Sequence, residues 1–294
     1  MTEDHGVLAA ALTSRGKRGD LDFGAAFELV DFLCAAHVHG IVLFAAAGEY
    51  PAFGTEERAR LLRLAVKRSR VPVYAGVGAV SLEDSLNLAR NAFSAGASGV
   101  LVPPPHFYRY TQEEIREFYR QFVSETPVGT AVYIVNTPSV TTPIAAETAL
   151  DLLSTGHFAG IEDSGTDGAC FALQRYCWLA GDDATIASAR LLGASGVVSS
   201  VANAVPELIR ELDCALRSGN ATRAASLDAM LQEFHAWNGR FAQPVVLKVA
   251  AELRGLKMGP LPVPVSAERA RILDEFREWF RDWLPAVKKL TSNG

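Results

Sequence analysis

The chain has 294 residues, of which 49% are hydrophobic and 21% are charged, and its formal net charge is −5. This composition suits a globular protein with a large core and offers no broad basic surface for nucleic acid. The acidic N-terminus is unlike a signal peptide and no apolar run approaches the ~20 residues that span a bilayer, so we expect a cytoplasmic protein without a membrane or nucleic-acid partner.

Short apolar runs of the kind that form buried strands recur along the first two thirds of the chain. Most of them are apolar throughout rather than alternating, as expected of parallel strands that are covered on both faces. The predicted strands are residues 6–12, 40–46, 71–77, 99–105, 129–136, 158–162, 177–181 and 196–200.

Amphipathic stretches with helical periodicity separate most of these runs. Thr55, Ser81 and Thr111 are each placed to cap such a helix, close to an acidic residue in its first turn. Alternating strands and helices in this number predict a closed (β/α)8 barrel, the TIM barrel. The alternative is a doubly wound sheet, which usually has fewer strands and a GxGxxG loop after the first one, a pattern that residues 11–20 do not contain.

The last part of the chain contains only helical patterns. We therefore predict a barrel core over residues 1–205, and a last barrel helix with a C-terminal helical appendage over residues 206–294. The segment between the sixth and seventh predicted strands is short, with room for a helix of only about residues 166–174. We expect the barrel wall to be irregular there.

The sixth predicted strand ends on two carboxylates, Glu162 and Asp163. Barrel enzymes carry their catalytic groups at the carboxyl ends of the strands, so Glu162 is the leading functional candidate. The alternative is that Glu162 only pairs with a backbone group or a buried cation. Asp182 and Asp183 raise the question of a divalent metal, but no histidine stands at ligand spacing, and we favour turn or cap roles and no metal or cofactor.

A series of motifs spans the chain from about Gly6 to the C-terminus. They are GIVLFAAAGEYPAFGTEER, VPVYAGVGAVSLEDSLNLARNAFSAGASGVLVPPPHFYRYTQEE, VNTPSVTT, GIEDSG, LAGDD, GASGVVSSVANAVPE and PVVLKVAAELRGL. In order and spacing they resemble the dihydrodipicolinate synthase / N-acetylneuraminate lyase family, which is class I aldolase-like. The resemblance implies a barrel enzyme that acts on a 2-oxo acid such as pyruvate, and a homo-oligomer, either a dimer or a tetramer.

The family's chemistry, as the resemblance implies it, depends on a lysine at the end of the sixth strand that forms a Schiff base with the substrate. Glu162 holds that position, and a carboxylate cannot form an imine. Other polar positions of the family have also become apolar: a proton-relaying tyrosine is Val135, an arginine is Val140, two paired threonines that hold the substrate carboxylate are Ala46 and Ala47, and a second tyrosine is Phe107.

These replacements predict a substrate pocket around Glu162 that is lined by apolar side chains. The pocket residues implied by the resemblance are Ala46, Ala47, Phe107, Val135, Val140 and Val198. Burial among such side chains disfavours a charged carboxylate, so we expect the pKa of Glu162 to be raised.

Three other residues are weaker candidates for chemistry. Tyr133 lies two positions before Val135, on the same strand face but one layer deeper, where core packing is the alternative. His106, in the loop after the fourth predicted strand, is a candidate for proton transfer, with a surface role as the alternative. Lys248 lies in a predicted helix rather than at a strand end, which favours a structural role over that of a displaced amine.

Two functions remain open. One is a lyase with altered acid–base chemistry, in which Glu162 acts on a small organic acid or a largely apolar substrate. The other is a non-catalytic binding or regulatory protein, a pseudoenzyme. A pocket that is open at Glu162 favours the first, and one filled by Phe107, Val135 and Val140 favours the second. Under both we expect a small-molecule ligand and a homo-oligomer, for which the aromatic loop at residues 103–110 is suited.

Overall fold

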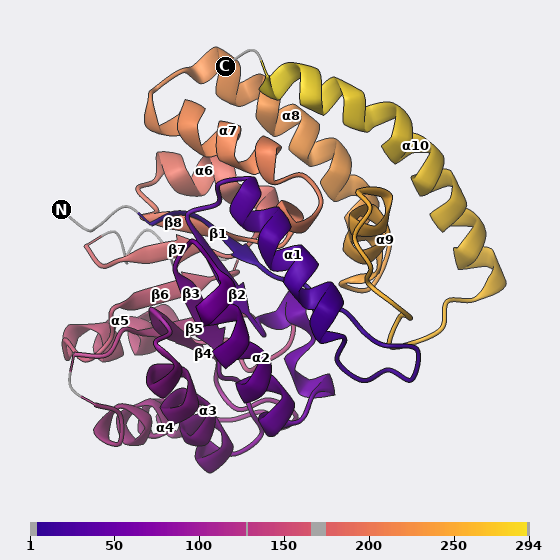
Figure 1. Ribbon diagram of the computed structural model, residues 1–294. Helices are drawn as coiled ribbons and strands as arrows, with labels where there is room; N and C mark the ends of the chain where they lie inside the picture. The colour runs from indigo at the N-terminus through magenta and orange to yellow at the C-terminus, as the bar shows by residue number, and fades with distance from the viewer. Residues whose placement is uncertain (1–4, 128, 166–174, 293–294) are drawn as a thin grey trace.

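A computed structural model of the chain describes residues 5–127, 129–165 and 175–292. Its centre is a closed barrel of parallel strands in the order β1 to β8, with β8 paired to β1 (Figure 1). The strands are β1 Gly6–Ala10, β2 Gly40–Leu43, β3 Val73–Gly76, β4 Gly99–Val102, β5 Val132–Asn136, β6 Gly160–Asp163, β7 Trp178–Ala180 and β8 Gly196–Ser199.

Helices connect the strands and surround the barrel. They are α1 Phe23–Ala35, α2 Thr55–Arg68, α3 Leu82–Ala95, α4 Gln112–Ser124, α5 Ala146–Ser154, α6 Ile186–Leu191 and α7 Pro206–Arg217. Three further helices, α8 Ala221–Asn238, α9 Val245–Leu253 and α10 Ala267–Thr291, pack against one side of the barrel in Figure 1. The predicted (β/α)8 barrel with a C-terminal helical appendage is confirmed. The helix predicted at residues 166–174 lies outside the described residues.

Local capping follows the sequence in two of three cases. The side chains of Ser81 and Thr111 accept hydrogen bonds from the backbone N–H groups of the first turns of α3 and α4. The prediction for Thr55 is wrong, because Thr55 is already the first residue of α2 and Gly54 precedes it. The carboxylate of Glu57 accepts the Gly54 N–H (3.2 Å), so the helix begins one residue earlier without a hydroxyl cap.

The core has two parts, one inside the barrel and one between the barrel and the helices. The inner part is built by alternate residues of the strands, which point into the barrel with a period of two. The inner side chains that fill it include Leu8, Val42, Tyr74, Leu101, Tyr133 and Leu179. Every strand position is buried, which accounts for the apolar runs that predicted the strands.

The barrel is closed by the pairing of β8 with β1 and by one buried side chain beyond it. Leu8 is in register with Val198, and Asn203 follows in the short turn after β8. The Asn203 amide donates to the carbonyl of Ala10 (2.7 Å) and accepts the N–H of Leu12 (3.0 Å). These bonds satisfy backbone groups just past the end of β1, where strand pairing has stopped.

A membrane-spanning helix is not found in the described part of the chain, since none of its helices is both long and apolar enough.

The closure contact predicts a large effect for a small substitution. Asn203→Ala should lower the free energy of unfolding by about 2–4 kcal/mol, because the buried Leu12 N–H and Ala10 carbonyl both lose their partner. The measurement is urea unfolding followed by circular dichroism. Asn87→Ala, at an exposed position of α3, is the control and should change stability little. Equal midpoints for the two variants would contradict this account of closure.

Candidate functional site

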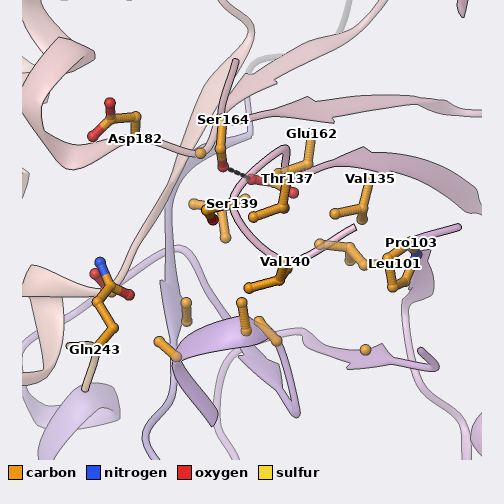
Figure 2. A pocket seen from close by; sticks show the side chains of 18 of the residues that line it. Leu101, Pro103, Val135, Thr137, Ser139, Val140, Glu162, Ser164, Asp182 and Gln243 are labelled. Atoms are coloured by element: carbon orange, nitrogen blue, oxygen red, sulfur yellow. Dashed lines mark hydrogen bonds between the residues drawn. The ribbon is translucent and has the colours of Figure 1, made fainter. Parts of the chain in front are cut away.

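A cavity of about 520 Å³ opens at the carboxyl ends of the barrel strands. Figure 2 shows Leu101, Pro103 and Val135 on one side of it and Asp182 and Gln243 on the other, with Glu162 and Ser164 between them. Barrel enzymes place their active sites at this end of the fold. The cavity is therefore the candidate active site.

Glu162 projects into this cavity from β6 and is only 6% exposed. One carboxyl oxygen, Oε1, accepts a hydrogen bond from the Ser164 hydroxyl at 2.8 Å, the dashed line in Figure 2. Burial raises the pKa of Glu162 to about 8, with the Ser164 hydrogen bond opposing the rise and the charge of Asp163 adding to it. The expectation of a raised pKa is confirmed, and the group holds its proton in most molecules at neutral pH.

Gly181, at the end of β7, makes room for this carboxyl group. A Cβ atom at this position would lie 1.6 Å from Glu162 Oε1 and 2.3 Å from the Ser164 hydroxyl oxygen. Any larger residue would displace Glu162 from its contact with Ser164. Gly181 is thus a positioning residue of the site that the sequence did not single out.

The neighbouring aspartates serve the loops. Asp163 accepts hydrogen bonds from the Asn136 amide (2.9 Å) and the Gly165 N–H (2.8 Å). Asp182 accepts the N–H of Ala184 at 3.0 Å. Asp183 accepts the N–H of Val201 at 3.0 Å and the hydroxyls of Ser199, the last residue of β8, and Ser200, which follows it. These contacts agree with turn and cap roles. Over the residues that the structure describes, no group of three or more potential metal ligands occurs.

Most of the predicted pocket residues line the cavity. These are Ala46, Ala47, Val135, Val140 and Val198. Phe107 is the exception: its side chain is 80% exposed, packs edge-to-face on Tyr108 and does not line the cavity of its own chain. The backbone at Phe107 has a φ of 87°, which few residues other than glycine adopt.

Tyr133 and His106, the weaker candidates, do not line the cavity. Tyr133 lies in the deeper barrel layer, where its ring packs edge-to-face on Tyr74 and His5. His106 is half-buried, and its Nδ1 atom lies 3.2 Å from the hydroxyl of Tyr50, which does line the cavity. Burial, and to a lesser degree the charge of Arg58, lowers the pKa of His106, so the ring is neutral at pH 7.

The lysines of the chain lie away from the cavity. Lys248 is buried in α9 and forms an ion pair with Glu49, whose other oxygen lies 3.1 Å from Nη2 of Arg15. This pairing supports a structural role for Lys248. The remaining lysines, at positions 17, 67, 257, 288 and 289, are exposed. Of the residues described, no lysine or arginine lines the cavity, and the sequence outside the described ranges contains neither.

The cavity has a further wall that sequence reasoning missed. His235 and Asn238, on α8, line it together with Gln243. A signal for Asn238 was present, because it continues the buried stripe formed by Leu227, Leu231 and Phe234 at helical spacing. A polar residue in such a stripe needs a partner, and that need identifies it as a candidate.

The sequence and the fold are similar to those of a known protein family. A sequence model of the Dihydrodipicolinate synthetase family matches residues 3–279. A 4-hydroxy-tetrahydrodipicolinate synthase from Azoarcus sp. (strain BH72) is 32% identical over 270 residues, which cover 89% of this chain and 92% of that protein. The structure of dihydrodipicolinate synthase from Aquifex aeolicus has a TM-score of 0.89 at 25% identity, covering 95% of this chain and 98% of that one.

A third protein is alike in fold alone. It is a catalytic lysine mutant of the sialic acid aldolase from Ruminococcus gnavus, with a TM-score of 0.88 at 21% identity, and the match covers 98% of this chain and 100% of that one.

The raised pKa of Glu162 predicts a stability difference that depends on pH. Between pH 4.5, the ordinary pKa of this carboxyl group, and about pH 8, its pKa in the folded protein, the unfolded chain has lost the proton while the folded chain keeps it. The free energy of unfolding of the wild type therefore falls as pH rises through this window and levels off above it. Glu162→Gln removes this loss and should be stabilised relative to wild type by roughly 2–4 kcal/mol at pH 8, and by little at pH 5. The measurement is urea unfolding at both pH values.

The exposed Glu233→Gln on α8 is the matched control and should show no such pH dependence. A Glu162→Gln effect of equal size at both pH values, or a larger loss at pH 8, would mean that Glu162 is ionised and well paired in the folded protein.

Proposed function

The chain belongs to the Dihydrodipicolinate synthetase family, and we propose that it is a lyase that acts on a small molecule by acid–base catalysis at Glu162, without a Schiff base. The observation that carries this proposal is a carboxyl group with a pKa of about 8 at the end of β6, inside an open cavity. The family's aldolase chemistry on pyruvate is the activity that we expect to be lost.

The loss of the Schiff base is supported by the position of every lysine. The sialic acid aldolase of Ruminococcus gnavus has a catalytic lysine, the residue changed in its mutant structure, and an amine is the group that attacks a carbonyl to form an imine. In this chain the corresponding strand end carries Glu162, Lys248 is paired with Glu49, and the other lysines are at the surface. The proton relay that the family resemblance implies would also be missing, since Ala46, Ala47 and Val135 have no hydroxyl.

The state of Glu162 suits proton transfer. A general acid works best when its pKa lies near the operating pH, because it then holds a proton and can still release it. Oε1 is held by Ser164, and in the described residues the second oxygen has no hydrogen-bond partner. That oxygen is available to give a proton to a substrate carbonyl or leaving group, and to take it back in a later step.

An open cavity favours this proposal over a pseudoenzyme with a filled pocket. Phe107 is at the surface, and Val135 and Val140 line the cavity without filling it. A volume of about 520 Å³ falls in the usual range for small-molecule sites, which is roughly 300–1,000 Å³.

Borohydride trapping tests the absence of a Schiff base. After incubation with pyruvate and reduction, the mass of the intact protein should be unchanged, because no lysine is in reach of a carbonyl in the cavity. The measurement is electrospray mass spectrometry, with an aldolase of this fold that has its catalytic lysine as positive control. A specific adduct on a lysine of this chain would overturn the proposal.

We also propose that the chain forms a homo-oligomer through the loop after β4. Phe107 is 80% and Tyr108 63% exposed, and their rings pack edge-to-face with centroids 4.9 Å apart. Large aromatic side chains left at a surface are typical of interface cores. A second copy of this chain, as in a dimer or tetramer, is the partner that the family resemblance implies.

Light scattering at micromolar concentration tests this interface. Wild type should have the mass of a dimer or larger, and Phe107→Ser with Tyr108→Ser should shift the distribution toward monomer, because the apolar area that drives association is removed. Val263→Ser, an exposed apolar residue elsewhere, is the control and should leave the mass unchanged. A wild-type monomer, or an unchanged mass in the double variant, would contradict the proposed interface.

A further inference from the structure

The charges of the cavity argue against an acidic ligand. Its described lining includes Glu162 and Asp182 but no lysine or arginine. Sites that bind a carboxylate tightly usually supply charge-assisted donors. Here the positions of the family's paired threonines, which hold the substrate carboxylate as the resemblance implies, carry the methyl groups of Ala46 and Ala47. A carboxylate ligand would therefore be desolvated beside the Asp182 carboxylate, with no lysine or arginine in the described lining to compensate its charge.

Asn238 provides the second observation. It is the last residue of α8, is only 5% exposed and lines the cavity. Its backbone carbonyl accepts the N–H of Phe241 (3.3 Å), but within the part of the chain that the structure describes its side-chain amide has no hydrogen-bond partner. Buried amide groups are almost always paired. The Asn238 amide is not among the side-chain groups that are sealed off without a partner, so it is open to the cavity, where a ligand can take the place of water.

His235 lies on the same face of α8. It is three residues before Asn238, so the two side chains are neighbours on the helix surface. Its Nδ1 atom is buried and has no hydrogen-bond partner in the described chain, and the residue also lines the cavity. Two polar side chains on one helix face thus line the same space, and the Asn238 amide is the one whose unpaired groups are open to it, because Nδ1 of His235 is sealed off.

We propose that the cavity binds an uncharged, hydroxyl-bearing small molecule, with one end at Glu162 and the other hydrogen-bonded to Asn238, which acts as a specificity-determining residue. The inference rests on the proposed function, since it names the ligand class of the same site. An uncharged, hydroxyl-bearing ligand replaces the small organic acid that we expected from the sequence.

A hydroxyl group is the chemical match for this wall. An amide side chain offers donors and an acceptor, and a hydroxyl both donates and accepts, so one contact can use either group of Asn238. A carboxylate only accepts and would leave the amide oxygen unpaired. The hydroxyls of Thr137 and Ser139, on the cavity wall after β5, extend the same preference.

Matched pairs of compounds test the ligand class. The probes are aldoses and their polyols, D-xylose with xylitol and D-glucose with sorbitol, each against the aldonate of the same carbon number, with lactamide against lactate as a short pair. Binding is screened by thermal shift and measured by calorimetry on the full-length protein at pH 7. We expect at least one uncharged probe to bind, and its carboxylate counterpart to bind at least tenfold more weakly.

Variants of α8 test the role of Asn238. Asn238→Ala should weaken binding of the uncharged probe about tenfold, as for one lost hydrogen bond, and should keep the melting temperature of the ligand-free protein, since the amide has no partner there. Asn238→Asp, which keeps the shape and removes the donors, provides a second variant if Asn238→Ala fails to fold. Glu233→Ala, at an exposed position of the same helix, should bind as wild type does.

The outcomes separate this inference from the proposed function. The inference is overturned if no uncharged probe binds, if carboxylates bind as tightly, or if neither Asn238 variant weakens binding. A different result is that uncharged probes bind through Asn238 but Glu162→Gln shows no pH-dependent change in stability. That result would count against Glu162 as the acid–base group and leave the ligand class intact.

Discussion

The pairing of β8 with β1 is the constraint on which the rest of the structure depends. An open sheet of these strands would leave two edges of unpaired backbone groups, and closure removes both. The register that places Leu8 beside Val198 continues past the strand ends through Asn203, which binds Ala10 and Leu12. Because closure gathers all strand ends into one ring, it also creates the cavity that those ends surround.

Within that ring, the chemistry is set by what surrounds one carboxyl group. Glu162 is shielded from water, Gly181 provides the space for it, and Ser164 holds one oxygen. Burial outweighs the stabilising hydrogen bond, so the pKa rises to about 8 rather than falling. Lys248, which is buried, forms its ion pair with Glu49 outside the cavity. The amine that a Schiff base needs and the acid that proton transfer needs therefore do not lie together in this cavity.

The cavity joins two parts of the fold with different tasks. The strand ends carry Glu162, and α8 brings the unpaired amide of Asn238 to the same cavity. Such a division is common in barrel enzymes, where the barrel carries the chemistry and added segments select the ligand. With Asn238 in the selecting role that we propose, the selecting segment belongs to the C-terminal helices, and ligand preference can change there without disturbing closure.

The sequence by itself determined what depends on local pattern. Apolar runs located all of the strands, hydroxyl residues before acidic turns located the caps at Ser81 and Thr111, and the end of β6 delivered Glu162 to a buried position with the raised pKa expected of it. These features follow from periodicity and burial over a few neighbouring residues, which the order of residues encodes directly.

Only the tertiary structure decided the features that join distant segments. The closeness of Gly181 to Glu162, the closure through Asn203 and the arrival of Asn238 at the cavity each depend on elements that are separate along the chain. A single sequence encodes such contacts through packing of the whole barrel, because a side chain's partner is fixed by three-dimensional proximity and not by spacing.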